Sequence, residues 1–267
     1  TVKLTTVLCA GLGVLLSCSQ VQAEEAKAEL KQISNVRISM QRMLRSTEGR
    51  YFLDLYAGIW NPHAELYDFV EKKYIDFKGS QKGDQLDLKS VDDKGNADAF
   101  SLTGVLNANT GVFKSMLTKN SEGRSVHFEP AFKASDRPTF VMKFYGLEDS
   151  KQPYGKALKR VDMIDKNTGK VAQSLTGFTA YANSIGYLDV NFDGYFDVVL
   201  SDTSQGRKVE DKRFVYWMYN PKTKKFQRSA QLERIVGFPN LKGEKQQIDF
   251  ADGQLFQVEK GLLRKAN

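Results

Sequence analysis

Residues 189–197 carry the oxygen-bearing side chains and the spacing of a calcium-binding loop. Counting Asp189 as position 1, side-chain oxygens fall at positions 1, 3, 5 and 9, and Gly194 stands at position 6, where such a loop turns sharply. Ca²⁺ takes about six to eight oxygen ligands, which this spacing supplies in part from side chains and a main-chain carbonyl. The predicted ligands are Asp189, Asn191, Asp193, the Tyr195 carbonyl and Asp197. The alternative is an Asx-rich turn without an ion.

The loop is not an EF-hand. An EF-hand has a bidentate Glu at position 12, whereas Leu200 stands there, and residues 196–200 are typical of a strand. The loop instead resembles the loop-to-strand calcium sites of integrin-type FG-GAP propeller repeats. We therefore expect the calcium to stabilise the fold rather than to perform chemistry.

No catalytic constellation accompanies this loop. The two histidines, His63 and His127, lie in a predicted loop and a predicted strand, where structural roles are expected. The sequence has no Gly-x-Ser-x-Gly elbow, phosphate-binding loop, dinucleotide fingerprint or His-Glu-x-x-His. We therefore predict that the protein is not an enzyme.

Short alternating strands must position the loop. Hydrophobic and polar residues alternate over many short runs, and Gly, Asn and Asp turn residues separate them. Roughly sixteen strands and no long amphipathic helix are expected, so the fold class is all-β. The clearest runs are residues 51–55, 73–77, 85–88, 100–105, 140–144, 214–219 and 255–258.

Two architectures suit such a chain. The first is a small β-propeller of about five blades with a calcium-binding loop. The alternative is two packed antiparallel β-domains with a boundary within residues 134–138. In either case the β-rich domain is expected over residues 50–267, after a polar, helix-favouring tether over residues 24–49.

Residues 1–23 are predicted to be an export signal. One cation, Lys3, precedes an apolar run over residues 4–17 that is too short to span a bilayer. Residues 15–18 resemble a lipobox in which Cys18 would be lipidated, which would account for a lone cysteine after processing. We expect a periplasmic protein with a lipid anchor in the outer membrane. Ordinary cleavage after Ala23 is the alternative and would give a soluble periplasmic or secreted protein.

Charge and composition restrict the partners. The 267 residues include 39 Lys and Arg against 32 Asp and Glu, a net charge of +7, with 41% hydrophobic residues. These values are ordinary for a folded globular protein. The cations are spread along the chain and the protein is predicted to be exported, so nucleic acid is not an expected partner. The expected partners are instead anionic envelope polymers or an acidic enzyme cleft.

A family resemblance rests on the calcium loop and the strand that follows it. Residues 186–197 and the aromatic run of residues 216–226, together with the lipobox, resemble the periplasmic lipoprotein immunity proteins of antibacterial type IV secretion systems. The resemblance implies a calcium-bearing β-propeller that inhibits a lysozyme-like muramidase or another peptidoglycan hydrolase. The alternative is an envelope or glycan-binding module that calcium stabilises and that has no inhibitory activity.

Two segments beside the calcium loop are candidates to enter the cleft of such a hydrolase. Each is expected to be a loop that offers a hydroxyl group together with an aromatic ring or a cation. The predicted inhibitory residues are Ser184, Gly186 and Tyr187 before the calcium loop, and Ser204, Gly206, Arg207 and Lys208 after it. The alternative for the second segment is a solvated basic hairpin.

Overall fold

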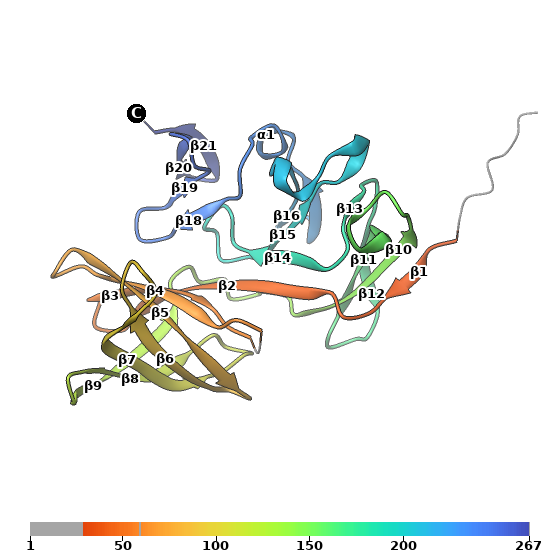
Figure 1. Cartoon of the computed structure of the whole chain (residues 1–267). Helices are drawn as coiled ribbons and strands as arrows, with labels where there is room; N and C mark the ends of the chain where they lie inside the picture. Colours follow the sequence, from red (N-terminus) through yellow and green to blue (C-terminus); the bar gives the residue numbers. More distant parts are fainter. Residues whose placement is uncertain (1–28, 59, 267) are drawn as a thin grey trace, which may run out of the picture.

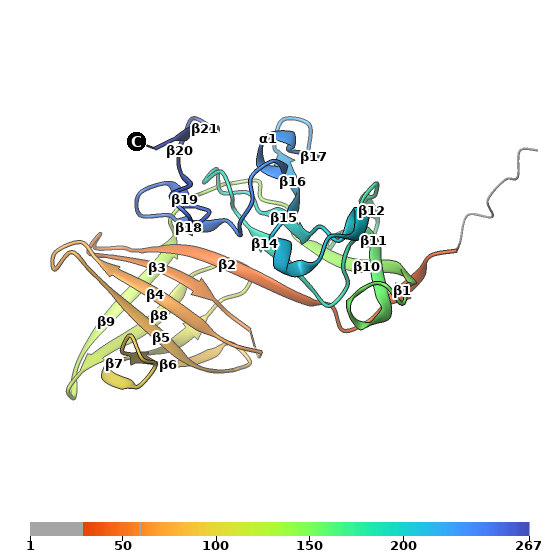
Figure 2. The same cartoon turned by 45° about the horizontal axis from the view of Figure 1, so that its top comes forward.

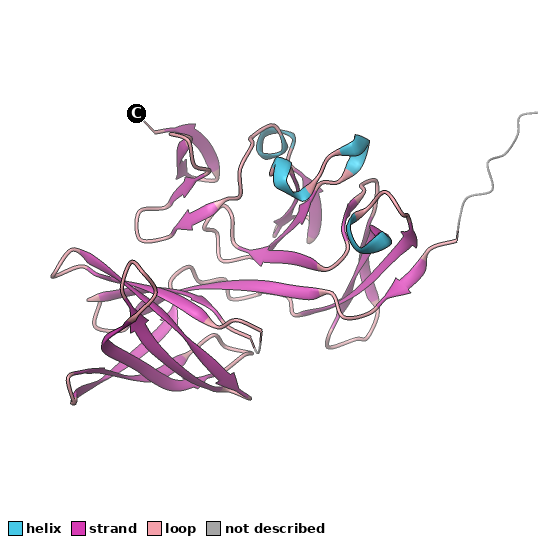
Figure 3. Cartoon of the chain, in the orientation of Figure 1, coloured by secondary structure: helices cyan, strands magenta, loops and turns pink. Residues whose placement is uncertain are grey.

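The computed structural model describes residues 29–58 and 60–266, and within them the chain is almost entirely β-structure (Figure 3). The one α-helix in these ranges, α1 (Ala230–Glu233), is a single turn. None of the helices there is long and apolar enough to cross a membrane. The predicted all-β class is therefore confirmed. The predicted signal peptide over residues 1–23 and its Cys18 lie outside the described residues.

Eight consecutive strands form a closed antiparallel barrel (Figure 2). Each strand pairs with the next, and the last pairs with the first, with Leu44 opposite Pro130 and Ser46 opposite Phe128. Inward residues alternate with outward ones, as the burial of every second residue in the fourth to sixth strands of the chain shows. The strands are β2 (Arg37–Ser46), β3 (Tyr51–Tyr56), β4 (His63–Asp68), β5 (Lys73–Lys82), β6 (Gln85–Val91), β7 (Ala97–Leu106), β8 (Phe113–Lys119) and β9 (Glu122–Pro130).

Strand β2 belongs both to the barrel and to the sheet beside it (Figure 1). Its first half pairs in parallel with β14, where Arg37 lies opposite Ser184, and its second half pairs with β3, where Gln41 lies opposite Tyr56. The barrel sheet thereby continues outward through β14 (Ser184–Leu188), β15 (Asp197–Ser201), β16 (Phe214–Asn220) and β17 (Lys225–Arg228).

Two smaller sheets complete the described part of the chain. The first begins with the N-terminal strand β1 (Lys31–Ile33), which pairs with β10. The second is a C-terminal meander that lies over the barrel (Figure 1). The first sheet contains β1, β10 (Phe140–Glu148), β11 (Lys156–Asp165), β12 (Val171–Leu175) and β13 (Ala180–Tyr181); the second contains β18 (Asn240–Lys242), β19 (Gln247–Asp249), β20 (Leu255–Glu259) and β21 (Leu262–Lys265).

Three hydrophobic cores stabilise these sheets. One fills the barrel with residues such as Leu53 and Phe113. A second joins the β10–β12 sheet to β14–β17, and the third lies between β14–β16 and the C-terminal meander. Phe52 on the outer face of the barrel belongs to the third core. Strand β3 is therefore buried on both faces, by the barrel core and by the meander.

The prediction of a five-bladed propeller is wrong, because β9 returns to β2 and closes an eight-stranded barrel. The alternative of packed antiparallel β-domains fits, and the chain leaves the barrel after Pro130 and begins β10 at Phe140, on either side of the predicted boundary. Residues 31–33 and 37–46 of the predicted tether form β1 and β2 instead. The period-2 alternation of residues 37–40 is typical of a strand, and pairing with β10, β3, β9 and β14 overrides the local helix preference.

Candidate calcium loop and neighbouring basic loop

The residues of the predicted calcium loop lie between β14 and β15, and main-chain N–H groups hold their carboxylates. Asp189 accepts hydrogen bonds from the N–H groups of Asp193 at 3.0 Å and Gly194 at 2.7 Å. Gly194 has a φ of 88°, which favours glycine, and a Cβ there would lie 3.0 Å from the Phe132 carbonyl oxygen. The sharp turn expected at Gly194 therefore exists, and it packs against the chain that leaves the barrel.

Asp197 ends the loop and is fully buried. Its Oδ2 accepts from the N–H of Val190 at 2.9 Å, and its Oδ1 accepts from the N–H of Tyr219 at 2.8 Å. One carboxylate thus ties the calcium loop to the end of β16. This is a structural role that the spacing of the ligands alone does not predict.

The carboxylates of Asp189 and Asp197 are buried in the loop and lie near one another. Burial and the neighbouring Asp193 carboxylate raise the pKa of Asp189 to about 8. Burial, followed by the charge of Asp189, raises the pKa of Asp197 well above its ordinary value. A divalent cation would relieve both effects, because it favours the ionised form of each carboxylate.

The donor set fits a hard cation in part. The amide of Asn191 donates to Asp193 Oδ2 at 3.1 Å, but Asn191 Oδ1 is buried without a hydrogen-bond partner in the described structure. An unpaired buried oxygen beside carboxylates suits a Ca²⁺ ligand. However, no group of three or more His, Cys, Asp or Glu side chains within residues 29–58 and 60–266 has an arrangement that could hold a metal ion. A cation would therefore depend on the Asn191 and Tyr195 oxygens as well as on carboxylates.

The first predicted inhibitory segment is a strand and not a loop. Ser184, Gly186 and Tyr187 lie in β14, which pairs with β2 on one side and β15 on the other. The Tyr187 ring stacks on Phe196 with centroids 5.1 Å apart and packs against the second core. Burial raises the pKa of the Tyr187 hydroxyl. The Tyr187 ring therefore packs within the protein and is not available to anchor a partner.

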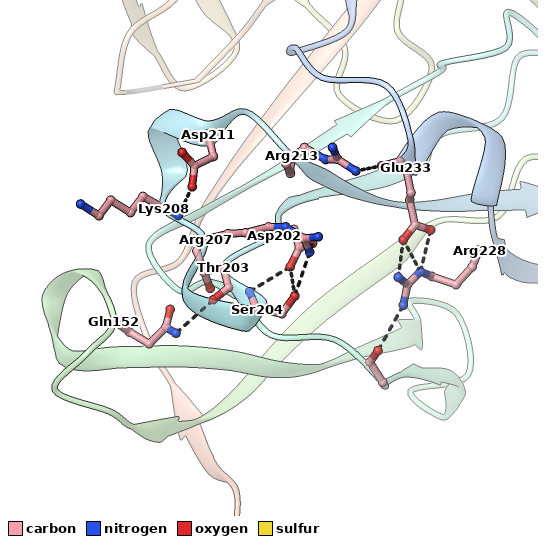
Figure 4. A network of polar contacts seen from close by, with 11 residues as sticks. Gln152, Asp202, Thr203, Ser204, Arg207, Lys208, Asp211, Arg213, Arg228 and Glu233 are labelled. Atoms are coloured by element: carbon pink, nitrogen blue, oxygen red, sulfur yellow. Dashed lines mark hydrogen bonds and ion pairs between the residues drawn. The ribbon is translucent and has the colours of Figure 1, made fainter.

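The second predicted segment is a loop, and hydrogen bonds fix its shape (Figure 4). Asp202 Oδ1 accepts from the N–H of Ser204 at 2.9 Å and from its hydroxyl at 2.6 Å. Asp202 Oδ2 accepts from Arg207 Nη1 at 2.7 Å. Gly206 has a φ of 75° and allows the turn between Ser204 and Arg207. Arg207 thus has an internal partner and positions the loop.

Lys208 is the exposed cation of this loop. Its main-chain N–H donates to Asp211 Oδ2 at 2.7 Å, while its side chain extends away from the network (Figure 4). Of the two predicted cations, Lys208 is therefore the one that is presented outward.

A buried acid on the outer face of the barrel was missed by the sequence analysis. Asp54 in β3 accepts from Gln41 Nε2 at 3.0 Å, and Tyr56 donates its hydroxyl to Gln41 Oε1 at 2.9 Å. Asp54 lies directly opposite Glu65 of β4. Burial, then the charge of Glu244, raises the pKa of Asp54 well above its ordinary value. The alternation in residues 51–55 places Asp54 opposite to the barrel core, but only the meander above β3 buries it.

Comparisons of the chain with protein-family models, with curated proteins and with solved structures give no match. The resemblance to immunity proteins therefore stays a prediction, and the function must be argued from the geometry.

Proposed function

We propose that this protein binds and inhibits a lysozyme-like peptidoglycan hydrolase, with residues 202–212 as the contact loop. The observation that supports the proposal is the outward Lys208 on a loop that Asp202, Ser204 and Arg207 already hold in one shape. A preformed loop loses little conformational entropy on binding. The cleft of a lysozyme-like enzyme contains two carboxyl groups, so an exposed cation on a preformed loop is complementary to it.

Calcium is part of this proposal. We assign it to Asp189, Asn191, Asp193, the Tyr195 carbonyl and Asp197. When bound, the ion would neutralise the buried carboxylates and hold the loop between β14 and β15. The same strand β15 leads directly to Asp202, so a firm calcium loop would also support the contact loop.

The proposed location follows from the export signal that the sequence predicts over residues 1–23. A protein that is anchored through Cys18 to the periplasmic side of the outer membrane would meet peptidoglycan hydrolases where they act. The lipid would serve only as an anchor, and the inhibitory contact would lie in the β-rich part of the chain.

Replacing Lys208 by alanine is expected to weaken inhibition of a sensitive muramidase about tenfold, which corresponds to about 1.4 kcal/mol. The side chain is exposed, so the melting temperature should barely change. The measurement is the clearing of a cell-wall suspension by the muramidase at increasing concentrations of the detergent-solubilised protein.

The matched control is Lys222→Ala, an exposed lysine in the turn between β16 and β17. It should inhibit like the wild type. Equal inhibition by the Lys208→Ala and Lys222→Ala variants would remove the contact loop from the proposal. A wild-type protein that inhibits none of several muramidases would contradict the proposed function itself.

A further inference from the structure

A groove of about 580 Å³ lies where the sheet that continues the barrel meets the chain leading to the C-terminal meander. Residues of β2, β14 and β15 line it, together with Lys212, Phe238 and Asn240. Its volume is within the range of about 300–1,000 Å³ that is typical of small-molecule sites.

Several of the lining side chains are small and share one face of the sheet. Ser184 lies opposite Arg37, Gly186 opposite Ser39, and Ser201 opposite Phe214, and residues opposite each other on paired strands point to the same face. The three serine hydroxyls and the Asn240 amide can both donate and accept hydrogen bonds. The groove therefore offers several polar groups in a mostly apolar setting.

Phe238 lines the groove, and a second aromatic ring, Trp60, contacts the lining residue Arg37. Trp60 is 65% exposed, and the guanidinium carbon of Arg37 lies 5.3 Å from its ring centroid. Phe238 is 36% exposed and packs edge-on against Phe214 at 5.6 Å. A large ring that is left exposed while its neighbours fix its position is typical of a binding surface.

The charged groups favour an anion. Arg37 and Lys212 both line the groove, and neither forms an ion pair with Asp or Glu in the part of the chain that the structure describes. Among the described lining residues, Glu210 is the one carboxylate. A guanidinium binds a carboxylate through two parallel hydrogen bonds. The groove is thus complementary to a ligand that carries a carboxylate.

We propose that this groove binds a carboxylate-bearing glycan strand. A sugar ring has a face of C–H groups that packs on an aromatic ring and an edge of hydroxyls that pairs with serine and asparagine. Phe238 supplies a ring within the groove, and Trp60 supplies a second ring beside Arg37. Arg37 is the partner of the carboxylate, and the polar groups are those of Ser39, Ser184, Ser201 and Asn240. The groove shares Val209, Glu210 and Lys212 with the contact loop of residues 202–212, but Lys208 does not line it.

The test measures binding of two tetrasaccharides to the full protein by calorimetry. One alternates N-acetylglucosamine with N-acetylmuramic acid and carries free carboxylates; the other, chitotetraose, is neutral. Trp60→Ala should weaken binding of both at least tenfold, and Arg37→Gln should weaken only the acidic one, at least fivefold. Met116→Ala and Lys114→Gln, both exposed on the barrel strand β8, are the controls and should bind like the wild type.

Two outcomes would contradict the proposal of a glycan site in the groove. If the wild type binds neither sugar, or if Arg37→Gln and Lys114→Gln bind the acidic sugar equally well, no such glycan site lies in this groove. If a muramidase is held by the wild type but lost in Arg37→Gln, while neither sugar binds, the groove belongs to a protein partner and the glycan proposal fails. Failure of inhibition in the Lys208 experiment bears on the proposed function alone, since calorimetry uses no enzyme.

Discussion

An Asp197→Ala variant is expected to lose about 2–6 kcal/mol of stability even when calcium is removed. The substitution leaves the buried N–H groups of Val190 and Tyr219 without their acceptors, at about 1–3 kcal/mol for each unsatisfied donor. For a chain of this size each kcal/mol lowers the melting temperature by about 2–4 °C, so we expect a fall of roughly 5–20 °C. Thermal unfolding in a calcium chelator measures it.

Asp193 provides the matched comparison, because it is half-exposed and its hydrogen bonds stay within the loop. In chelator, Asp193→Ala should melt near the wild type. At a calcium concentration one hundred times the dissociation constant, the wild type should gain about 2.7 kcal/mol by mass action, and Asp193→Ala should gain almost nothing.

Two results would contradict this account. A wild-type melt that is the same with chelator and with calcium would leave an Asx-rich turn in place of a calcium site. If Asp197→Ala and Asp193→Ala melt together in chelator, the two hydrogen bonds of Asp197 do not have the structural role assigned to them.

The local features of this fold could be predicted from the sequence, and the long-range ones could not. Alternating residues identified strands such as those at residues 51–55 and 73–77, and Gly194 identified a sharp turn, because both depend on neighbours in the chain. Barrel closure depends on Leu44 meeting Pro130, and no local pattern specifies that pairing. A series of short strands is therefore compatible with a propeller until the partner of β2 is known.

The same distinction between local and long-range features applies to the residues predicted to contact a hydrolase. Serine and glycine are common in loops. Ser184, Gly186 and Tyr187 form a strand here because β14 pairs with β15 on one side and, on the other, with β2 from a distant part of the chain. The sequence predicts that Arg207 is available to a partner protein, because nothing in the sequence shows that it pairs with Asp202. That pairing depends on the turn at Gly206, which brings the two side chains together. The sequence shows Trp60 close to Pro62, but it does not show that the Trp60 ring contacts Arg37 of the groove.

An Asp54→Asn variant is expected to be more stable than the wild type at pH 7. Burial, with the charges of Glu244 and Glu65 added, raises the pKa of Asp54 in the folded state, while the unfolded chain has the ordinary value of about 3.9. The folded state therefore holds this proton more tightly, and the wild type loses stability as the pH rises from about 4 toward the folded pKa. Asparagine cannot ionise, and its Oδ1 can still accept from Gln41.

The expected gain is a melting temperature above that of the wild type at pH 7. It should shrink toward zero as the pH falls to about 4, where Asp54 is protonated in both states. Asp76→Asn is the control, because Asp76 is exposed and faces Glu65 from the other side. Its melting temperature should follow the wild type at every pH. The Lys242 ammonium opposes the other charges around Asp54; if Asp54→Asn is less stable at pH 7, that attraction outweighs burial and Asp54 is ionised in the folded protein.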